Sequence, residues 1–199
     1  LSNNELSEIC NRLGKSNLIN TQQIYGGCIH DSWRIEFKDA RFFLKKNIRN
    51  QKLLKFESYC LNDLQKYINR SILITPRVIT YFVFENNEYL LMEWIDMKNF
   101  NQKNLGRGLA EMHLKSYENH PPKFGYSIEG YIGTSKQMEG WEKDWSECFV
   151  RLRIEPQLTY LKNYSVEEDL IKKLKSKIKI HLSNHEPMNS LVHGDLWSG

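Results

Sequence analysis

The residues of this sequence that could do chemistry fall into two groups, and one of them lies in the last ten residues. A short apolar run, Leu191-Val192, leads into His193, Gly194 and Asp195. An aspartate just beyond a strand can accept or orient the proton of a substrate hydroxyl, and a histidine two residues earlier can fix the loop by hydrogen bonds. A His-x-Asp motif is also common without any function, so this interpretation needs support from the rest of the chain.

The second group lies in the first hundred residues and could hold a nucleotide. Gly26 and Gly27 stand at an expected strand-to-strand turn, where glycine lets backbone N–H groups approach a phosphate. Lys45 ends an apolar strand, and Glu57 follows on an expected helix, an arrangement that holds a cation against nucleotide phosphates. Each feature has an ordinary alternative, because Gly-Gly is a common hairpin turn and a lysine at a strand end often reaches into water.

A third stretch, residues 89–94, is an apolar strand that runs into an expected lobe boundary. The backbone groups of Glu93 to Ile95 could meet the edge of a flat base there. The same residue types would also suit any central strand of a sheet.

The elements that must position these residues follow from hydrophobic periodicity. A first helix is expected from a cap at Asn3 or Asn4 to Gly14, and a second over residues 52–69. Strands are expected over 21–25, 32–37, 41–45, 78–84 and 89–94, with the last two joined by a turn at Asn86-Asn87. Helices are expected over 102–117, 141–161 and 165–182.

This order of elements predicts an α+β protein with two lobes. Residues 1–98 would form a five-stranded antiparallel sheet with one helix inserted after its third strand, and residues 99–199 would form a helical lobe. The hinge between the lobes is expected near residues 94–100.

Composition favours an ordinary globular protein. The 199 residues are 40% hydrophobic and carry a formal net charge of +4, and no apolar stretch approaches the length of a membrane span. The basic run 172–179 is interpreted as the solvated face of a helix, opposite an apolar stripe at Leu170, Leu174, Ile178 and Leu182, rather than as a nucleic-acid site. The four cysteines are widely spaced without a zinc-type pair, which favours a reducing, cytoplasmic location.

The order of the pieces gives them more weight than each has alone. A Gly-rich turn, a strand lysine, a helix glutamate, a hinge, a helical lobe and a His-x-Asp loop follow one another as in a kinase-type phosphotransferase. The motif His193-Gly-Asp-Leu-Trp-Ser-Gly199 resembles the catalytic loop of the fructosamine-3-kinase (ketosamine-3-kinase) family, relatives of the aminoglycoside and choline kinases. Further stretches are similar to that family at 26–29, 43–45, 56–57, 109–113, 124–126, 140–145 and 153–157.

The resemblance implies a protein-kinase-like fold and ATP-dependent phosphorylation of a ketosamine at the sugar 3-hydroxyl, in protein deglycation. Asp195 would act on the attacking hydroxyl, Lys45 would hold the α- and β-phosphates, and the backbones of Glu93 and Ile95 would bind adenine. The nucleotide-binding residues implied are Gly26, Gly27, Cys28, Lys45, Glu57, Met92, Glu93 and Ile95. Mg²⁺ is implied as well, with its expected ligands beyond Gly199 and none within this chain.

Aromatic residues are expected at the substrate. Trp141 and Trp145 would lie four apart on one face of a helix, and with Trp197 they would form a flat wall for a sugar ring. His193 and Asp144 are the polar candidates beside them. Core packing for the helical tryptophans, and a surface or capping role for Asp144, remain open.

Three alternatives stay open at this point. The substrate could be another small hydroxyl compound, such as an aminoglycoside or choline. The chain could also be a catalytically inactive nucleotide- or sugar-binding module, because the expected metal-binding residues are missing from it. Finally, Cys28 in the Gly-rich turn could link two copies as a redox-sensitive dimer.

Overall fold

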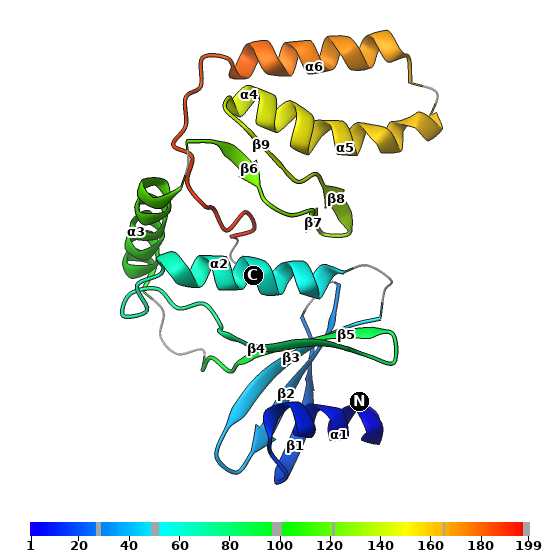
Figure 1. The fold of residues 1–199 in the computed structure, drawn as a ribbon, viewed down its shortest axis with the longest axis vertical. Coiled ribbons are helices and arrows are strands. Elements are labelled where there is room, and N and C mark those ends of the chain that lie inside the picture. Colours follow the sequence, from blue (N-terminus) through cyan, green and yellow to red (C-terminus); the bar gives the residue numbers. More distant parts are fainter. Residues whose placement is uncertain (27–28, 49–51, 97–100, 121, 165, 197–199) are drawn as a thin grey trace. The chain divides into compact units, whose positions relative to one another are not determined.

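The computed structural model describes residues 1–26, 29–48, 52–96, 101–120, 122–164 and 166–196. Contacts between residues divide the chain into two compact units, Leu1–Glu111 and Met112–Gly199. Each unit is described by itself below. Figure 1 labels the elements of both.

The first unit is built on one antiparallel sheet. Its strands are β1 (Leu18–Ile24), β2 (Asp31–Phe37), β3 (Arg41–Asn47), β4 (Val78–Phe84) and β5 (Asn87–Glu93). They form a five-stranded sheet in the order β1-β2-β3-β5-β4. Along the chain, helix α2 (Leu53–Tyr67) lies between β3 and β4. The predicted five-stranded sheet with one helix after its third strand is therefore confirmed.

The two helices of this unit cover opposite faces of the sheet, as Figure 1 shows. Helix α1 (Asn3–Leu13) packs through Ile9 on a cluster that includes Trp33, Leu44 and Leu91. Helix α2 packs through Leu54 on a second cluster, formed by Leu90 and Met92 with the half-buried Phe43, Leu61, Val78 and Tyr81. Alternate residues of β3 and β5 therefore serve two cores, which is the pattern of a sheet buried on both sides.

Helix α1 begins one residue earlier than expected. Ser2, rather than Asn3 or Asn4, is the N-cap, and it forms a capping box with Glu5. Gly14 ends the helix with φ of 61°, as expected for the residue after a helix end.

The β4–β5 hairpin turns at Glu85-Asn86 instead of Asn86-Asn87. Both turn residues have positive φ, 47° and 64°, and Phe84 pairs with Asn87 across the turn. Two consecutive positive φ values match the right-handed twist of the strands, and asparagine tolerates this conformation well.

The second unit is less regular than predicted. After α3 (Gln102–Asn119) come two small two-stranded sheets. One pairs β6 (Phe124–Tyr126) with β9 (Gly140–Glu142), and the other is a hairpin of β7 (Gly130–Ile132) and β8 (Ser135–Gln137), which lie between them in the chain. A helical segment follows, made of α4 (Trp145–Cys148), the π-helix η1 (Phe149–Ile154), α5 (Glu155–Leu158) and the 3-10 helix η2 (Thr159–Tyr164). The expected helix 141–161 is therefore wrong at its start, because Trp141 lies on a strand.

The change of helix type before α5 has a cause in the sequence. Pro156 has no N–H with which to bond the carbonyl of Leu152 four residues earlier. The Arg153 side chain takes that place, because its Nη1 donates to the Leu152 carbonyl at 3.0 Å and to the Met138 carbonyl at 3.2 Å. Wide π-type turns commonly accommodate such an interruption.

The last helix, α6 (Glu168–Leu182), runs beside the α4–η1 segment (Figure 1). Its half-buried residues are Ile171, Lys175, Ile178 and Leu182, so the expected stripe through Leu170 and Leu174 is displaced by one residue in its first half, and those two leucines are exposed. Lys175 pairs with Glu155 and Lys179 with Glu147, which places two lysines of the basic run at a helix–helix contact. Among the described residues, no helix is both long and apolar enough for a membrane span.

Candidate active site

The expected phosphate-binding lysine forms an ion pair with the expected helix glutamate. Lys45 Nζ lies 2.6 Å from Glu57 Oε1, and both side chains are about one quarter exposed (27% and 28%). Lys45 and Phe43 share the α2 side of β3, whereas Lys46 points to the opposite face and pairs with Glu5 at 2.6 Å. The two neighbouring lysines thus have different partners on different faces of the sheet.

The Gly-rich turn is described only in part. Gly26 has φ of 128° and no heavy atom within 4 Å of the position where a Cβ would stand, so its backbone is open on that side. Such a φ is one that other residues rarely adopt. Gly27 and Cys28 lie outside the described residues.

The end of β5 is fixed by the packing of Met92 and by bonds from Glu93 to Arg70 and Arg77, two residues that the sequence did not single out. Met92 is buried against Leu54 and Leu90, so it shapes the core on the α2 side. The carboxylate of Glu93 accepts two hydrogen bonds from Arg70 Nη2, at 2.8 and 2.9 Å, and its backbone N–H donates to the Arg77 carbonyl at 2.9 Å. The side chain of Glu93 is therefore an anchor for this strand end.

Trp94 and Asp96 continue the same anchoring, and neither was predicted. Arg41 donates to both carboxylate oxygens of Asp96, at 2.9 and 3.1 Å, and Trp94 Nε1 donates to Asp96 at 3.0 Å. The Arg34 guanidinium lies 5.8 Å from the centre of the Trp94 ring, which is within cation–π range. Half-buried Ile95 stands between Trp94 and Asp96, so its backbone is held on both sides.

The His193–Asp195 loop of the second unit is held by few bonds. The Asp195 N–H donates to His193 Nδ1 at 3.3 Å, and Gly194 between them has φ of 81°. Upstream, the N–H of Leu191 donates to the hydroxyl of Ser116 on α3 at 2.9 Å. Both His193 and Asp195 are exposed, so the carboxylate of Asp195 is open to a substrate.

The two tryptophans expected on one helical face lie on different elements. Trp141 is on β9, opposite Gly125, and is 36% exposed, with His120 5.9 Å away between ring centres. Trp145 begins α4 and packs against Phe124 and Phe149 at 5.7 and 5.6 Å. The prediction that both tryptophans share one helical face is therefore wrong, and half-buried Trp145 packs in an aromatic cluster with Phe124 and Phe149.

The remaining substrate candidates are Asp144 and Trp197. Asp144 is the N-cap position of α4, but its side chain forms no capping hydrogen bond and is exposed. Trp197 lies outside the described residues.

The described ranges contain possible metal ligands and cysteines. His, Cys, Asp and Glu side chains there do not gather in groups of three or more that could hold a metal ion. The carboxylates of the described residues thus do not form a magnesium site. Within the described ranges, Cys10, Cys60 and Cys148 form no disulfide, and burial raises the pKa of Cys148.

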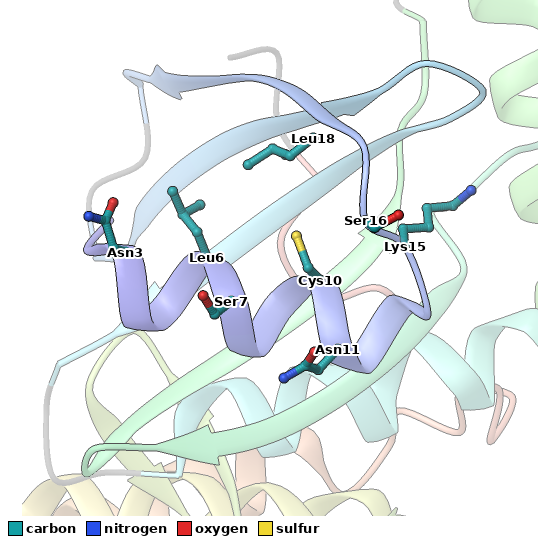
Figure 2. Close-up of a pocket in the computed structure, with 8 residues that line it drawn as sticks. All are labelled: Asn3, Leu6, Ser7, Cys10, Asn11, Lys15, Ser16 and Leu18. Carbon is teal, nitrogen blue, oxygen red and sulfur yellow. The ribbon is translucent and has the colours of Figure 1, made fainter.

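A cavity of about 470 Å³ lies between α1 and the start of β1, as Figure 2 shows. Leu6 and Cys10 of α1 and Leu18 of β1 are among the residues that line it. It lies beside α1, whereas Lys45 and Glu57 pair on the α2 side, so none of the candidate residues contributes to it.

The fold defines the class of protein. A solved structure of the aminoglycoside phosphotransferase APH(4)-Ia matches 92% of this chain with a TM-score of 0.52 at 12% identity, covering 60% of that chain. A crystal structure of a candidate fructosamine-3-kinase from Haemophilus somnus matches 96% of this chain with a TM-score of 0.78 at 23% identity, covering 65% of that chain. The chain thus has the kinase-like fold of these phosphotransferases.

The sequence narrows this class to one family. The family profile described as "Fructosamine kinase" matches residues 3–199, and the chain belongs to this family. A "Probable ketoamine kinase" of Vibrio cholerae is 28% identical over 199 residues, which is 98% of this chain and 67% of that protein. The chain spans 60% to 67% of the length of the curated relatives it matches.

Proposed function

We propose that this protein contributes to ATP-dependent phosphorylation of ketosamines at the sugar 3-hydroxyl, a step in protein deglycation. The observation that carries this proposal is the Lys45–Glu57 ion pair at 2.6 Å, in a member of the fructosamine kinase family that also has the His193-Gly-Asp195 loop. The names of relatives such as the Vibrio cholerae "Probable ketoamine kinase" support the substrate class.

The nucleotide would be held by the first unit. The Lys45 ammonium, oriented by Glu57, would contact the α- and β-phosphates, and the open backbone at Gly26 would face a phosphate. Because the N–H of Glu93 is bonded to Arg77, adenine contacts would fall to the Glu93 carbonyl and the Ile95 N–H. The aminoglycoside phosphotransferase of similar fold was solved with AMP-PNP, which supports a nucleotide site in this fold.

The chemical step would be carried by the second unit. The 3-hydroxyl oxygen attacks the γ-phosphorus of ATP, the bond to ADP breaks, and the hydroxyl proton passes to the Asp195 carboxylate. His193 would hold the loop by accepting the Asp195 N–H. Magnesium would arrive with ATP, and because the described residues offer no cluster for it, no step here depends on a metal ligand of this chain.

The substrate contacts are proposed from exposure. The half-open face of Trp141 suits a sugar ring, and the exposed carboxylate of Asp144 suits the amine of a ketosamine. Trp197 is kept as a third candidate beside the catalytic aspartate. We also propose that residues 1–98 form a nucleotide-binding lobe and residues 99–199 a substrate lobe. The proposed location is cytoplasmic.

The test is transfer of phosphate from ATP to fructoselysine, followed by mass spectrometry and by NMR assignment of the phosphorylated oxygen. It uses this chain and a version extended with the part of the Vibrio cholerae relative that the chain does not match. We expect phosphate on the 3-oxygen and a loss of kcat of about a thousandfold in Asp195→Asn. Preferred transfer to an aminoglycoside or to choline would contradict the substrate, and ATP binding without transfer to any of them would indicate a binding module.

A further inference from the structure

One buried carboxylate in the first unit accepts hydrogen bonds from four donors on three segments, β3, β4 and the start of α2. Glu88 on β5 is 6% exposed. Its Oε2 accepts from Asn47 Nδ2 of β3 at 2.7 Å and from the Leu54 N–H at 3.3 Å. Its Oε1 accepts from the Tyr81 hydroxyl of β4 at 2.8 Å and from the Lys55 N–H at 3.2 Å.

Two of those donors, the amides of Leu54 and Lys55, belong to the first turn of α2, whose N–H groups have no acceptor within the helix. The helix begins at Leu53, and its own N-cap residue, Lys52, makes no side-chain capping bond. The first turn contains no acidic residue either. The first N–H groups of a helix need an acceptor, and a carboxylate is favoured there by the helix dipole. Glu88 supplies that acceptor from a neighbouring strand.

The other two donors tie this cap to the strand that carries Lys45. Asn47 follows Lys45 by two residues on β3, so both side chains lie on the same face of the sheet. Asn47 is 1% exposed, so its position is fixed by packing. Glu57 lies one helical turn after the capped amides, on the same helix.

We propose that Glu88 is a positioning residue for the nucleotide site, which sets the start of α2 against β3 so that Glu57 meets Lys45. This inference rests on the proposed function. Glu88 itself does not touch the nucleotide, and it acts by holding the element that carries Glu57. Burial raises the pKa of the bonded Tyr81 hydroxyl, and its hydrogen bond to Glu88 adds to that effect, so tyrosine stays the donor.

Glu5 provides a matched control in the same unit. It is also a buried carboxylate at a helix start, it accepts from the Tyr89 hydroxyl, and it pairs with Lys46. It belongs to α1, on the face of the sheet opposite to Lys45. Glu5→Gln should therefore destabilise the unit without moving the Lys45–Glu57 pair.

The experiment measures ATP affinity by calorimetry and amide exchange at residues 53–57 by mass spectrometry, in the full chain. We expect Glu88→Gln to weaken ATP binding by about tenfold and to speed exchange at Leu54 and Lys55, because a positioning error is amplified at the site. Glu5→Gln should leave both unchanged. In a Glu57→Gln background, Glu88→Gln should weaken ATP binding no further, since its effect passes through Glu57.

Several results would overturn the inference. Equal loss of affinity in Glu5→Gln and Glu88→Gln, or additive loss in the double variant, would show a general stability effect. If Glu88→Gln does not fold, Tyr81→Phe is used instead, because it removes one of the four bonds to Glu88. It should weaken ATP binding and speed exchange at Leu54 and Lys55 by smaller factors. If the unsubstituted chain does not bind ATP, the proposed function fails, and exchange at Leu54 and Lys55 alone decides whether Glu88 holds α2.

Discussion

The candidate residues of the first unit and those of the second are held in place by different means. In the first unit, the residues around Lys45 are held by side chains with several bonds each, such as Glu88 and Glu93, on a regular sheet. In the second unit, the His193–Asp195 loop is exposed and tied to α3 by the bond to Ser116. The comparison indicates that the proposed nucleotide-binding residues are preorganised by charge and burial, whereas the proposed catalytic loop depends on the backbone around it.

The largest expected effect concerns the backbone of the second unit. A Cβ on Gly125 would lie 2.0 Å from the carbonyl oxygen of Gly140 on the paired strand, and Gly125 has φ of 133°. We expect Gly125→Ala to lower the free energy of unfolding by about 3–4 kcal/mol, because both strand separation and backbone strain result. Thermal unfolding followed by circular dichroism measures this.

Gly133→Ala is the matched control for that substitution. Gly133 also has positive φ, 61°, but nothing lies within 4 Å of its Cβ position. Gly133→Ala should lower the free energy of unfolding by about 1 kcal/mol, because alanine disfavours this backbone conformation. Equal losses at Gly125 and Gly133 would show that close backbone approach does not limit this unit.

The next effect is a pH dependence in the first unit. Burial alone would raise the pKa of Glu5, but hydrogen bonds from Lys46, Tyr89 and the Ser2 amide outweigh it and lower the pKa from 4.5 to about 2. A lowered folded-state pKa gives stability that is present above the unfolded pKa and is lost as pH falls through the folded one. We expect Glu5→Gln to cost about 2 kcal/mol at neutral pH, with a difference that shrinks between pH 4.5 and 2.

Denaturant unfolding at several pH values measures that dependence. Glu8→Gln is the control, because Glu8 lies on the same helix, is less buried than Glu5 and, among the described residues, makes a single ion pair, with Arg12 four residues later. Its effect should stay below about 0.5 kcal/mol at each pH. A Glu5→Gln difference that is constant down to pH 2 would contradict the assignment.

The smallest expected effect concerns the hydrogen bond from the Leu191 N–H to Ser116, which holds the proposed catalytic loop to α3. Ser116→Ala removes the acceptor for the Leu191 N–H and should cost about 1 kcal/mol, with faster amide exchange at Leu191. Ser58→Ala is the control, because Ser58 is another buried helix serine that bonds the carbonyl three residues earlier. Unchanged exchange at Leu191 in Ser116→Ala would show that other contacts hold the loop.

The first unit could be predicted from the sequence in most of its elements, because its strands are seven residues long and rich in apolar residues, with β5 buried over five consecutive positions. The capping role of Glu88 could not be predicted, since its donors lie 7 to 41 residues away along the chain. One signal was present, namely an acidic residue at the start of the apolar run Tyr89 to Met92.

The second unit was harder to predict for physical reasons. Strands of three residues, such as β6 and β9, are too short to show alternation. Trp141 and Trp145 have helical spacing by coincidence, because the chain between them leaves β9 and enters α4. The motif Arg153–Gln157 resembles a substrate-lobe signature, yet Arg153 bonds the carbonyls of Leu152 and Met138, which is a structural role around Pro156.

The most direct test of the account is ATP titration of this chain by calorimetry, with Lys45→Ala compared with Lys46→Ala. Lys45 pairs with Glu57, and Lys46 pairs with Glu5 on the opposite face. We predict that the unsubstituted chain binds ATP, that Lys45→Ala weakens binding by about tenfold or more, equivalent to about 1.4 kcal/mol, and that Lys46→Ala leaves it unchanged. Absence of ATP binding, or equal affinities in the two variants, would contradict the assignment of the nucleotide site to Lys45.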